Sequence, residues 1–181
     1  GVVANLMNVK IMGSGSGQGE GKGVIKDGTG TMKMTEVEIS EVQTGIQVTS
    51  GNLTVNGGSM TGVQTGITMM GNGMLTVNGG TMTDVQTGIT MMGNGMLTVN
   101  NGARITVKNG GTGLSVGGTA TANLTNMTIA GGGATGTGVV MEGTGEMKMT
   151  DVRISKVEKA VLMKQGTVTM TGVQISNVAM G

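Results

Sequence analysis

The sequence predicts an all-β protein, a right-handed parallel β-helix (β-solenoid) of about eight rungs of about 22 residues each. Residues 63–84 and 85–106 begin with the same 16 residues, and residues 42–62 are the same unit one residue shorter. Repeats of this length are typical of chains that stack one small unit. Within a unit, apolar and polar residues alternate between Gly or Asn-Gly breaks, which is typical of short strands. We expect a right-handed helix because this rung is longer than the hexapeptide-based rung usual for left-handed ones.

Each unit divides into three predicted strands. In the unit that begins at Val63 they are Gly66 to Met70, Met74 to Val77, and Thr81 to Val85. The density of Gly, Thr and Val disfavours a helix. If each rung lies parallel on the rung before it, about 4.8 Å away, equivalent residues form columns along the axis.

The columns predict which side chains form the core. Four apolar columns should point inward: Leu53, Leu75 and Leu97; Val55, Val77 and Val99; Ile46, Ile67 and Ile89; and Val42, Val63, Val85 and Val107. Thr54, Thr76 and Thr98 should line up outside, where β-branched side chains suit a solvated strand. The chain contains no Phe, Trp or Tyr. Its interior must therefore be built from Val, Ile, Leu and Met, which suits a narrow core.

A longer duplication overlies the short repeat. Residues 28–42 match residues 143–157, and residues 4–11 match residues 122–129. The strand frame therefore extends over nearly the whole chain, and we expect residues 1–181 to form a single β-helix that is a fragment of a longer protein.

Asn56, Asn78 and Asn100 occupy one position in three successive units. Stacked Asn side chains can form an amide ladder at a turn. Alternatively, these residues tolerate left-handed turn geometry beside Gly. Either interpretation makes them structural.

Two methionine pairs, Met69-Met70 and Met91-Met92, recur in the units. Strict alternation would expose one methionine of each pair and create a flexible surface suited to adaptable binding. A bend at Gly71 or Gly93 would instead bury both. We favour the bend, because an uncovered methionine stripe promotes aggregation.

Three stretches break the pattern and are predicted to be irregular loops: residues 13–22, 109–119 and 131–138. The first and third follow the two matching segments 4–11 and 122–129, so they should leave one corner of the helix. Insertions in solenoids often gather on a binding face. The alternative is a flexible connection without function.

Charges are unevenly distributed along the chain. From Val42 to Gly102 the only charged residue is Asp84. Eight charged residues in one early rung and in the late rungs are candidate partner-binding residues: Lys33, Glu36, Glu38, Glu41, Lys148, Asp151, Arg153 and Lys156. Such clusters can mark partner contacts, and a solvated face is the alternative.

Composition argues against several classes of function. The 11 basic and 10 acidic residues nearly balance, so no footprint for nucleic acid is visible. The chain contains no His or Cys, and its closest carboxylates are Glu36 and Glu38, which alternation places on one outward face. We therefore expect no enzyme, no cofactor and no metal site. No apolar run approaches the roughly 20 residues that span a bilayer.

Residues 63–88, VQTGITMMGNGMLTVNGGTMTDVQTG, are flanked on both sides by the pattern GVxxxGxGxMKMTxVxIS. These motifs resemble the passenger domains of Bartonella autotransporters, among them a group of secreted angiogenic factors. The resemblance covers residues 23–108 and 136–181 well and the remainder loosely.

The resemblance implies a secreted or surface-displayed passenger, carried across the outer membrane by a C-terminal β-barrel translocator in the full-length chain. It also implies a host cell-surface receptor as partner, such as a vascular endothelial growth factor receptor on endothelial cells. A passive or adhesive stalk that presents other segments remains the alternative. Because an uncovered rung is a sheet edge, end-to-end self-association is also expected of a fragment.

Overall fold

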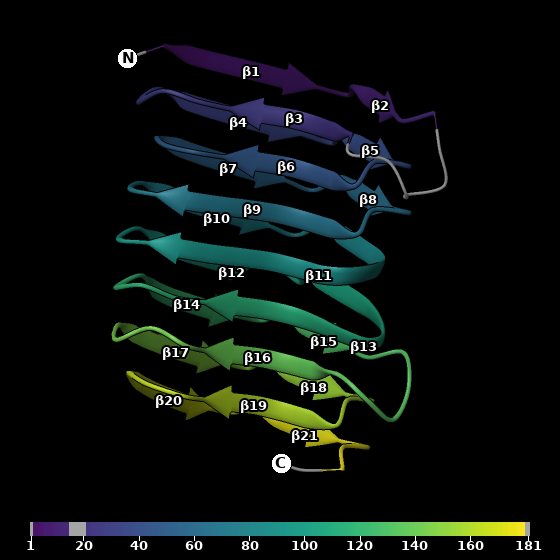
Figure 1. Ribbon diagram of the computed structural model, residues 1–181, viewed down its shortest axis with the longest axis vertical. Helices are drawn as coiled ribbons and strands as arrows, with labels where there is room; N and C mark the ends of the chain where they lie inside the picture. Colours follow the sequence, from purple (N-terminus) through teal and green to yellow (C-terminus); the bar gives the residue numbers. More distant parts are fainter. Residues whose placement is uncertain (1, 15–20, 180–181) are drawn as a thin grey trace.

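The computed structural model describes residues 2–14 and 21–179, and within them the chain is all-β. Its strands wrap into a β-helix with the two ends of the chain at opposite ends of the long axis (Figure 1). The described residues contain no helix that is long and apolar enough to cross a membrane.

Every turn of the β-helix has three faces. The first face consists of β1 (Val3–Met7), β4 (Thr31–Thr35), β7 (Asn52–Asn56), β10 (Met74–Asn78), β12 (Met96–Asn100), β14 (Thr121–Thr125), β17 (Glu146–Thr150) and β20 (Thr167–Thr171). The second face consists of β2 (Lys10–Met12), β5 (Glu38–Ser40), β8 (Ser59–Thr61), the first parts of β11 (Thr81–Gly93) and β13 (Arg104–Val116), β15 (Thr128–Ala130), β18 (Arg153–Ser155) and β21 (Gln174–Ser176). The third face consists of β3 (Lys22–Lys26), β6 (Thr44–Val48), β9 (Thr65–Gly71), the later parts of β11 and β13, β16 (Thr137–Met141) and β19 (Lys159–Met163).

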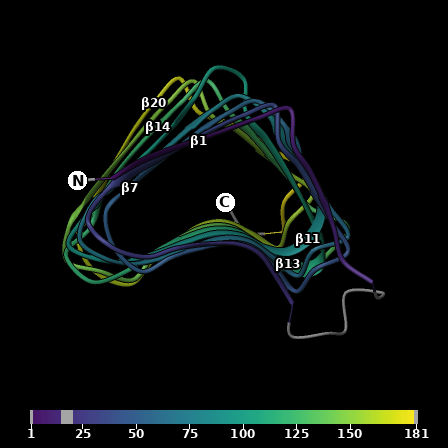
Figure 2. The ribbon, with the colours of Figure 1, turned by 90° about the horizontal axis from the view of Figure 1, so that it is seen from above.

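The predicted fold class is confirmed. All strand pairs within the three faces are parallel, and the chain makes about seven full turns. Two faces have one strand for each of the eight expected rungs, whereas the third face has one fewer. Viewed from its N-terminal end, the chain runs clockwise as it recedes, so the β-helix is right-handed (Figure 1 and Figure 2). The first corner joins the first face to the second face, and the second corner joins the second face to the third face. The third corner joins the third face to the first face of the next turn.

The pairing register confirms the predicted inward columns. Leu75 pairs with Leu53 and Leu97, and all three side chains are fully buried. The other three predicted columns are buried as well. Thr54, Thr76 and Thr98 are in register and lie half-buried on the outer side of the first face. The interior is therefore a stack of Val, Ile, Leu and Met layers, as the composition requires.

The predicted amide ladder is confirmed for one of its two steps, the step from Asn78 to Asn56. The side-chain amide of Asn78 donates to Oδ1 of Asn56 at 2.8 Å, while Oδ1 of Asn100 is buried and accepts no hydrogen bond among the described residues. The left-handed residue at this corner is instead the next one in each unit, such as Gly57 (φ 65°) or Gly79 (φ 71°). The interpretation of these three Asn as left-handed turn residues is therefore wrong.

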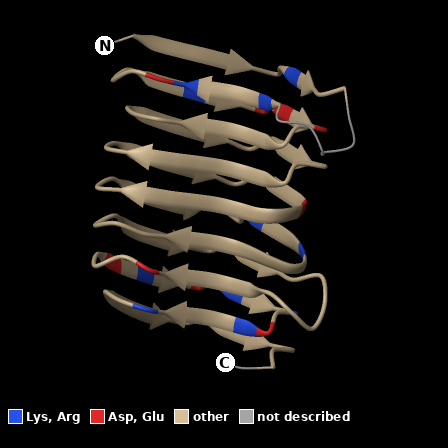
Figure 3. Ribbon diagram, viewed as in Figure 1, with Lys and Arg blue, Asp and Glu red and all other residues tan. Residues whose placement is uncertain are grey.

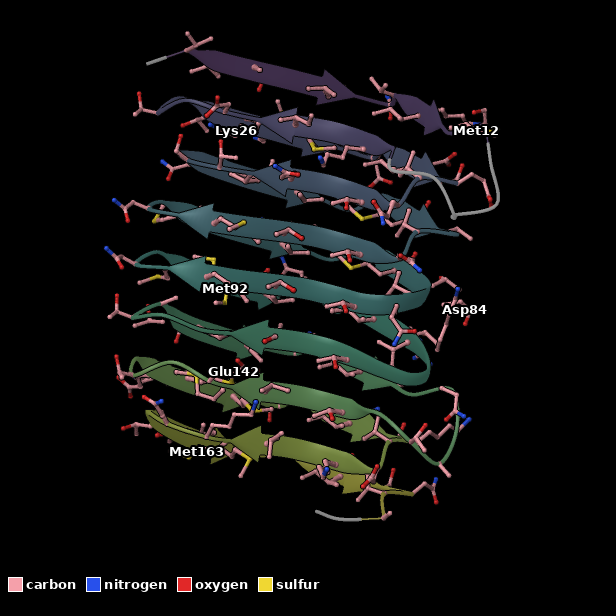
Figure 4. All side chains as sticks on the ribbon, in the orientation of Figure 1. Met12, Lys26, Asp84, Met92, Glu142 and Met163 are labelled. Atoms are coloured by element: carbon pink, nitrogen blue, oxygen red, sulfur yellow. The ribbon has the colours of Figure 1, made fainter. Side chains whose placement is uncertain are left out.

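The preferred interpretation of the methionine pairs is also wrong. Met69 and Met91 are fully buried, but Met70 and Met92 are 54% and 40% exposed. β9 and β11 continue through both methionines of each pair and end only at the following glycine, so alternation holds to the end of the strand. The chain does turn at Gly71 and Gly93, where φ is 109° and 120°, but the turn comes after the second methionine, which therefore still points outward, as Met92 does in Figure 4.

The three predicted loops have different outcomes. Residues 112–116 are not a loop, because they form the end of β13 and pair with β11 and β16, whereas residues 109–111 belong to β13 but interrupt its register. Val85 pairs with Val107 and Thr87 with Thr112, so this rung absorbs three extra residues at the second corner. Residues 131–136 do form a loop at the same corner, although Thr137 and Gly138 already belong to β16. Most of the 13–22 stretch, residues 15–20, lies outside the described residues, and Lys22 begins β3.

A column of glycines brings the third face close to the second face. Seen along the axis, the rungs superpose as a three-sided ring whose third side bends inward (Figure 2). The second residue of the third-face segment is a glycine in six of the seven rungs: Gly23, Gly45, Gly66, Gly88, Gly113 and Gly138. The last third-face strand, β19, has Ala160 at this position, where the described residues place no further third-face strand after it. A methyl group on Gly66 would lie 2.5 Å from the carbonyl oxygen of Gly88 and 2.6 Å from the sulfur of Met82. No side chain fits there without displacing backbone.

Replacing Gly66 by Ala should therefore lower the free energy of unfolding by about 2 kcal/mol, the typical cost of overpacking a core. Chemical denaturation followed by circular dichroism measures it. Gly21→Ala is the control, because a methyl group there would meet only Cγ1 of Val42, at 3.9 Å. Equal stability of the Gly66→Ala variant and the parent would contradict the close approach.

Replacing Asn78 by Ala should lower the free energy of unfolding by about 1 kcal/mol, because Oδ1 of Asn56 loses its amide donor. Thermal and chemical denaturation measure the change. The control is Asn72→Ala, at an exposed position of the third corner, which should stay within about 0.5 kcal/mol of the parent. If the ladder does not stabilise the fold, the two variants should have the same free energy of unfolding.

Candidate functional site

The eight candidate partner-binding residues are all exposed and form two separate clusters. Lys33, Glu36, Glu38 and Glu41 lie on β4, β5 and the corners beside them; we call this cluster the acidic patch, because three of its four charges are negative. Lys148, Asp151, Arg153 and Lys156 lie on β17, β18 and the corners beside them; we call this cluster the basic patch, because three of its four charges are positive.

The two patches occupy the same columns at opposite ends of the helix. Lys33 and Lys148 belong to one outward column of the first face, five strand steps apart. At about 4.8 Å per step, the patches are separated by roughly 24 Å. The inner rungs between them carry few charges (Figure 3). The structure therefore aligns the two clusters but does not bring them together into one site.

Half of the candidate residues have a left-handed backbone. Glu36 (φ 50°) and Asp151 (φ 53°) stand at the first corner, and Glu41 (φ 56°) and Lys156 (φ 57°) stand at the second. Glu36 is thus a corner residue and does not share a strand face with Glu38, contrary to the alternation argument. Left-handed geometry is uncommon for Glu and Lys, whereas Gly, Asn or Asp takes the equivalent position in most other rungs.

The corner carboxylates lie directly over glycines of the next rung. A methyl group on Gly57 would collide with the carboxylate of Glu36, and a methyl group on Gly172 would collide with that of Asp151. Each acidic side chain therefore extends along the helix axis across a bare backbone. This packing places the carboxylates at the surface of the first corner and restricts their orientation.

Two candidate residues form ion pairs. Nζ of Lys10 lies 3.7 Å from Glu38, and Nζ of Lys148 lies 3.9 Å from Glu146. Both pairs are well exposed, and exposed pairs contribute little to stability. A partner can therefore contact these charged groups, because displacing either ion pair loses only a weak interaction.

The basic patch contains a polar hollow of about 310 Å³. Asp151 and Arg153 line it together with Asn126, Thr128 and Gln174 from the rungs on either side. Its walls offer a guanidinium, a carboxylate and two amides within one concavity, so it suits a polar group of a partner.

A buried lysine is a feature that the sequence analysis missed. Lys26 pairs with the core residue Val48 and is only 5% exposed. Its ammonium group donates to the carbonyl oxygens of Gly28 at 2.8 Å and Ser50 at 2.9 Å (Figure 4). The signal in the sequence is a lysine at a position where later rungs have Val or Met. These contacts give Lys26 a structural role at the third corner.

Metal and ligand sites of the usual kinds are not evident in the described part of the chain. No group of three or more His, Cys, Asp or Glu side chains there could hold a metal ion. An apolar void beside Val55 and Met60 has a volume of about 20 Å³, enough for roughly one water molecule. That the chain is not an enzyme stays a prediction.

Comparisons of the chain with protein-family models, with curated proteins and with solved structures gave no match in any of the three.

Asp27, next to Lys26, should titrate below its ordinary pKa of 3.8. The Thr49 hydroxyl donates to its carboxylate at 2.6 Å and the Gly28 amide at 2.8 Å, and both bonds lower the pKa. Because the pKa of Asp27 is lower in the folded state than in the unfolded state, the ionised carboxylate stabilises the fold at pH values above the unfolded pKa. This stabilisation disappears as the pH falls through the folded pKa.

We expect Thr49→Val to raise the pKa of Asp27 toward 3.8, since it removes the larger of the two causes. Carboxyl NMR titration measures the midpoint. Thr68→Val, on the outer side of the same face, is the matched control and should leave the midpoint unchanged. An unchanged Asp27 midpoint in the Thr49 variant would show that the hydrogen bond does not set the pKa.

Proposed function

We propose that this chain is an extracellular binding module, a secreted or surface-displayed autotransporter passenger that engages a host cell-surface receptor through the acidic and basic patches. The observation that carries the proposal is the alignment of two exposed patches of opposite net charge on one strip of a continuous β-helix. Such a strip favours a partner with complementary charges spaced about 24 Å apart. Complementary charges of this kind contribute mainly to the rate of association and to specificity.

The class of receptor comes from the sequence resemblance to angiogenic passenger domains. On that basis the receptor we propose is a vascular endothelial growth factor receptor on endothelial cells. The β-helix would hold both patches at a fixed separation, because every rung is hydrogen-bonded to its neighbours. A receptor ectodomain that contacts both patches would be oriented along the helix axis.

A passive or adhesive stalk is the second candidate function. The observation that favours it is the regularity of the inner rungs, which carry a single charged residue, Asp84, between Val42 and Gly102. A shaft of this kind needs no specific partner of its own. The two candidates differ in whether the fragment alone binds saturably.

Purified residues 1–181 should bind the receptor ectodomain saturably, more weakly at higher ionic strength, and should cause receptor phosphorylation on endothelial cells. Neutralising the acidic patch (Glu36→Gln, Glu38→Gln, Glu41→Gln) or the basic patch (Lys148→Gln, Arg153→Gln, Lys156→Gln) should slow association roughly tenfold. Surface plasmon resonance measures the rates.

The control for this experiment is Glu142→Gln with Lys164→Gln, an exposed ion pair on the third-face side of the helix that removes one charge of each sign. It should associate like the parent. No saturable binding by the parent would leave the stalk function. If a variant with both patches neutralised still bound like the parent, the contact would lie on another surface.

A further inference from the structure

Four exposed methionines lie together on the inner rungs. Met70, Met74, Met92 and Met96 are 54%, 51%, 40% and 41% exposed. The other exposed large apolar side chains among the described residues belong to the first or the last rungs. In the inner rungs of the described β-helix, the exposed large apolar residues are therefore all methionines, and they lie beside one corner.

Strand register places the four methionines in two adjacent columns. Met70 pairs with Met92 at the end of the third face, and Met74 pairs with Met96 at the start of the first face. Paired residues in neighbouring parallel strands are about 4.8 Å apart. The two columns flank the third corner, where only Gly71, Asn72 and Gly73 intervene between Met70 and Met74.

The Met92 side chain extends along the helix axis. A methyl group on Gly117, which follows Met92 in its column, would lie 2.5 Å from the Met92 sulfur. The thioether of Met92 therefore lies over the next rung. A Met70 side chain that extends in the same direction brings its sulfur toward Met92, and three rotatable bonds allow the two sulfurs to adjust to a shared ligand.

The methionine thioethers at this corner are soft donors, and the corner residues Asn72 and Asn94 add only neutral amide groups. Thioether sulfur selects Cu(I) over the cations that prefer oxygen. The two units that contain these methionines, residues 63–84 and 85–106, carry two charged residues. Asp84 lies on β11 at the second corner, on the far side of the third face (Figure 4), and Arg104 begins β13 on the second face. We propose that the methionine columns at the third corner form a binding site for a soft monovalent cation, Cu(I), with Met70 and Met92 as one pair of ligands and Met74 and Met96 as the other. This site is independent of the receptor-binding patches.

An apolar docking surface is the competing explanation, and substitution by leucine separates the two. Leucine keeps the volume and the apolar character of methionine at a cost usually below about 1.5 kcal/mol, but it removes the sulfur. The chain also offers a matched control. Met163 and Met170 are 49% and 50% exposed, yet each pairs in register with a buried methionine, Met141 or Met149.

The test is a titration of the folded chain with Ag(I), a redox-stable analogue of Cu(I), followed through the methyl NMR signals of the methionines. A Cu(I) competition with a chromophoric chelator gives the affinity. The signals of Met70, Met74, Met92 and Met96 should shift before those of Met163 and Met170. Met70→Leu with Met92→Leu, and Met74→Leu with Met96→Leu, should each weaken binding at least roughly tenfold.

The double variant Met163→Leu with Met170→Leu should bind like the parent, and circular dichroism should show all three double variants folded. Equal shifts of all exposed methionines would overturn the proposal, since exposure alone would then explain binding. Retention of the parent affinity in both of the other double variants would overturn it as well.

Discussion

The close approach of the third face to the second face is the constraint on which the rest of the structure depends. In six of the seven third-face strands this position is a glycine, and a large residue of the second face, such as Met82 against Gly66 or Ile105 against Gly88, occupies the space that a side chain would need. The core is therefore narrow, and Ile and Met fill it in layers that repeat along the axis. The chain contains no aromatic residue, so aliphatic and methionine side chains supply all of this packing.

The fold could be predicted from sequence because repetition fixes both period and register. The alternation that predicted strands also predicted which column faces inward, and the copies at 63–84 and 85–106 set the partner of each residue. Local backbone geometry was harder to predict. Met70 was misplaced because the position of a bend depends on φ at Gly71. Residues 112–116 were misassigned to a loop because they lie in a Gly-rich stretch, although Gly113 belongs to the close-packed glycine column.

The candidate site was only partly predictable. The sequence identifies the charged residues but treats Glu36 and Glu38 as neighbours on one strand. The left-handed corner at Glu36 separates them, and such a corner is hard to predict for a glutamate. The polar hollow around Arg153 draws on three rungs, so no single stretch of sequence contains it. Lys26 reads as an ordinary surface charge until the register places it opposite Val48.

The near-identical inner units have a consequence for the spacing of the two patches. Because residues 63–78 and 85–100 are identical and pair with each other in register, one such unit can be lost or gained without altering the residues of the two patches. Each copy changes the distance between the patches by about 4.8 Å. A chain of this design can thus become longer or shorter by internal duplication or deletion, while the charged residues of both patches stay the same.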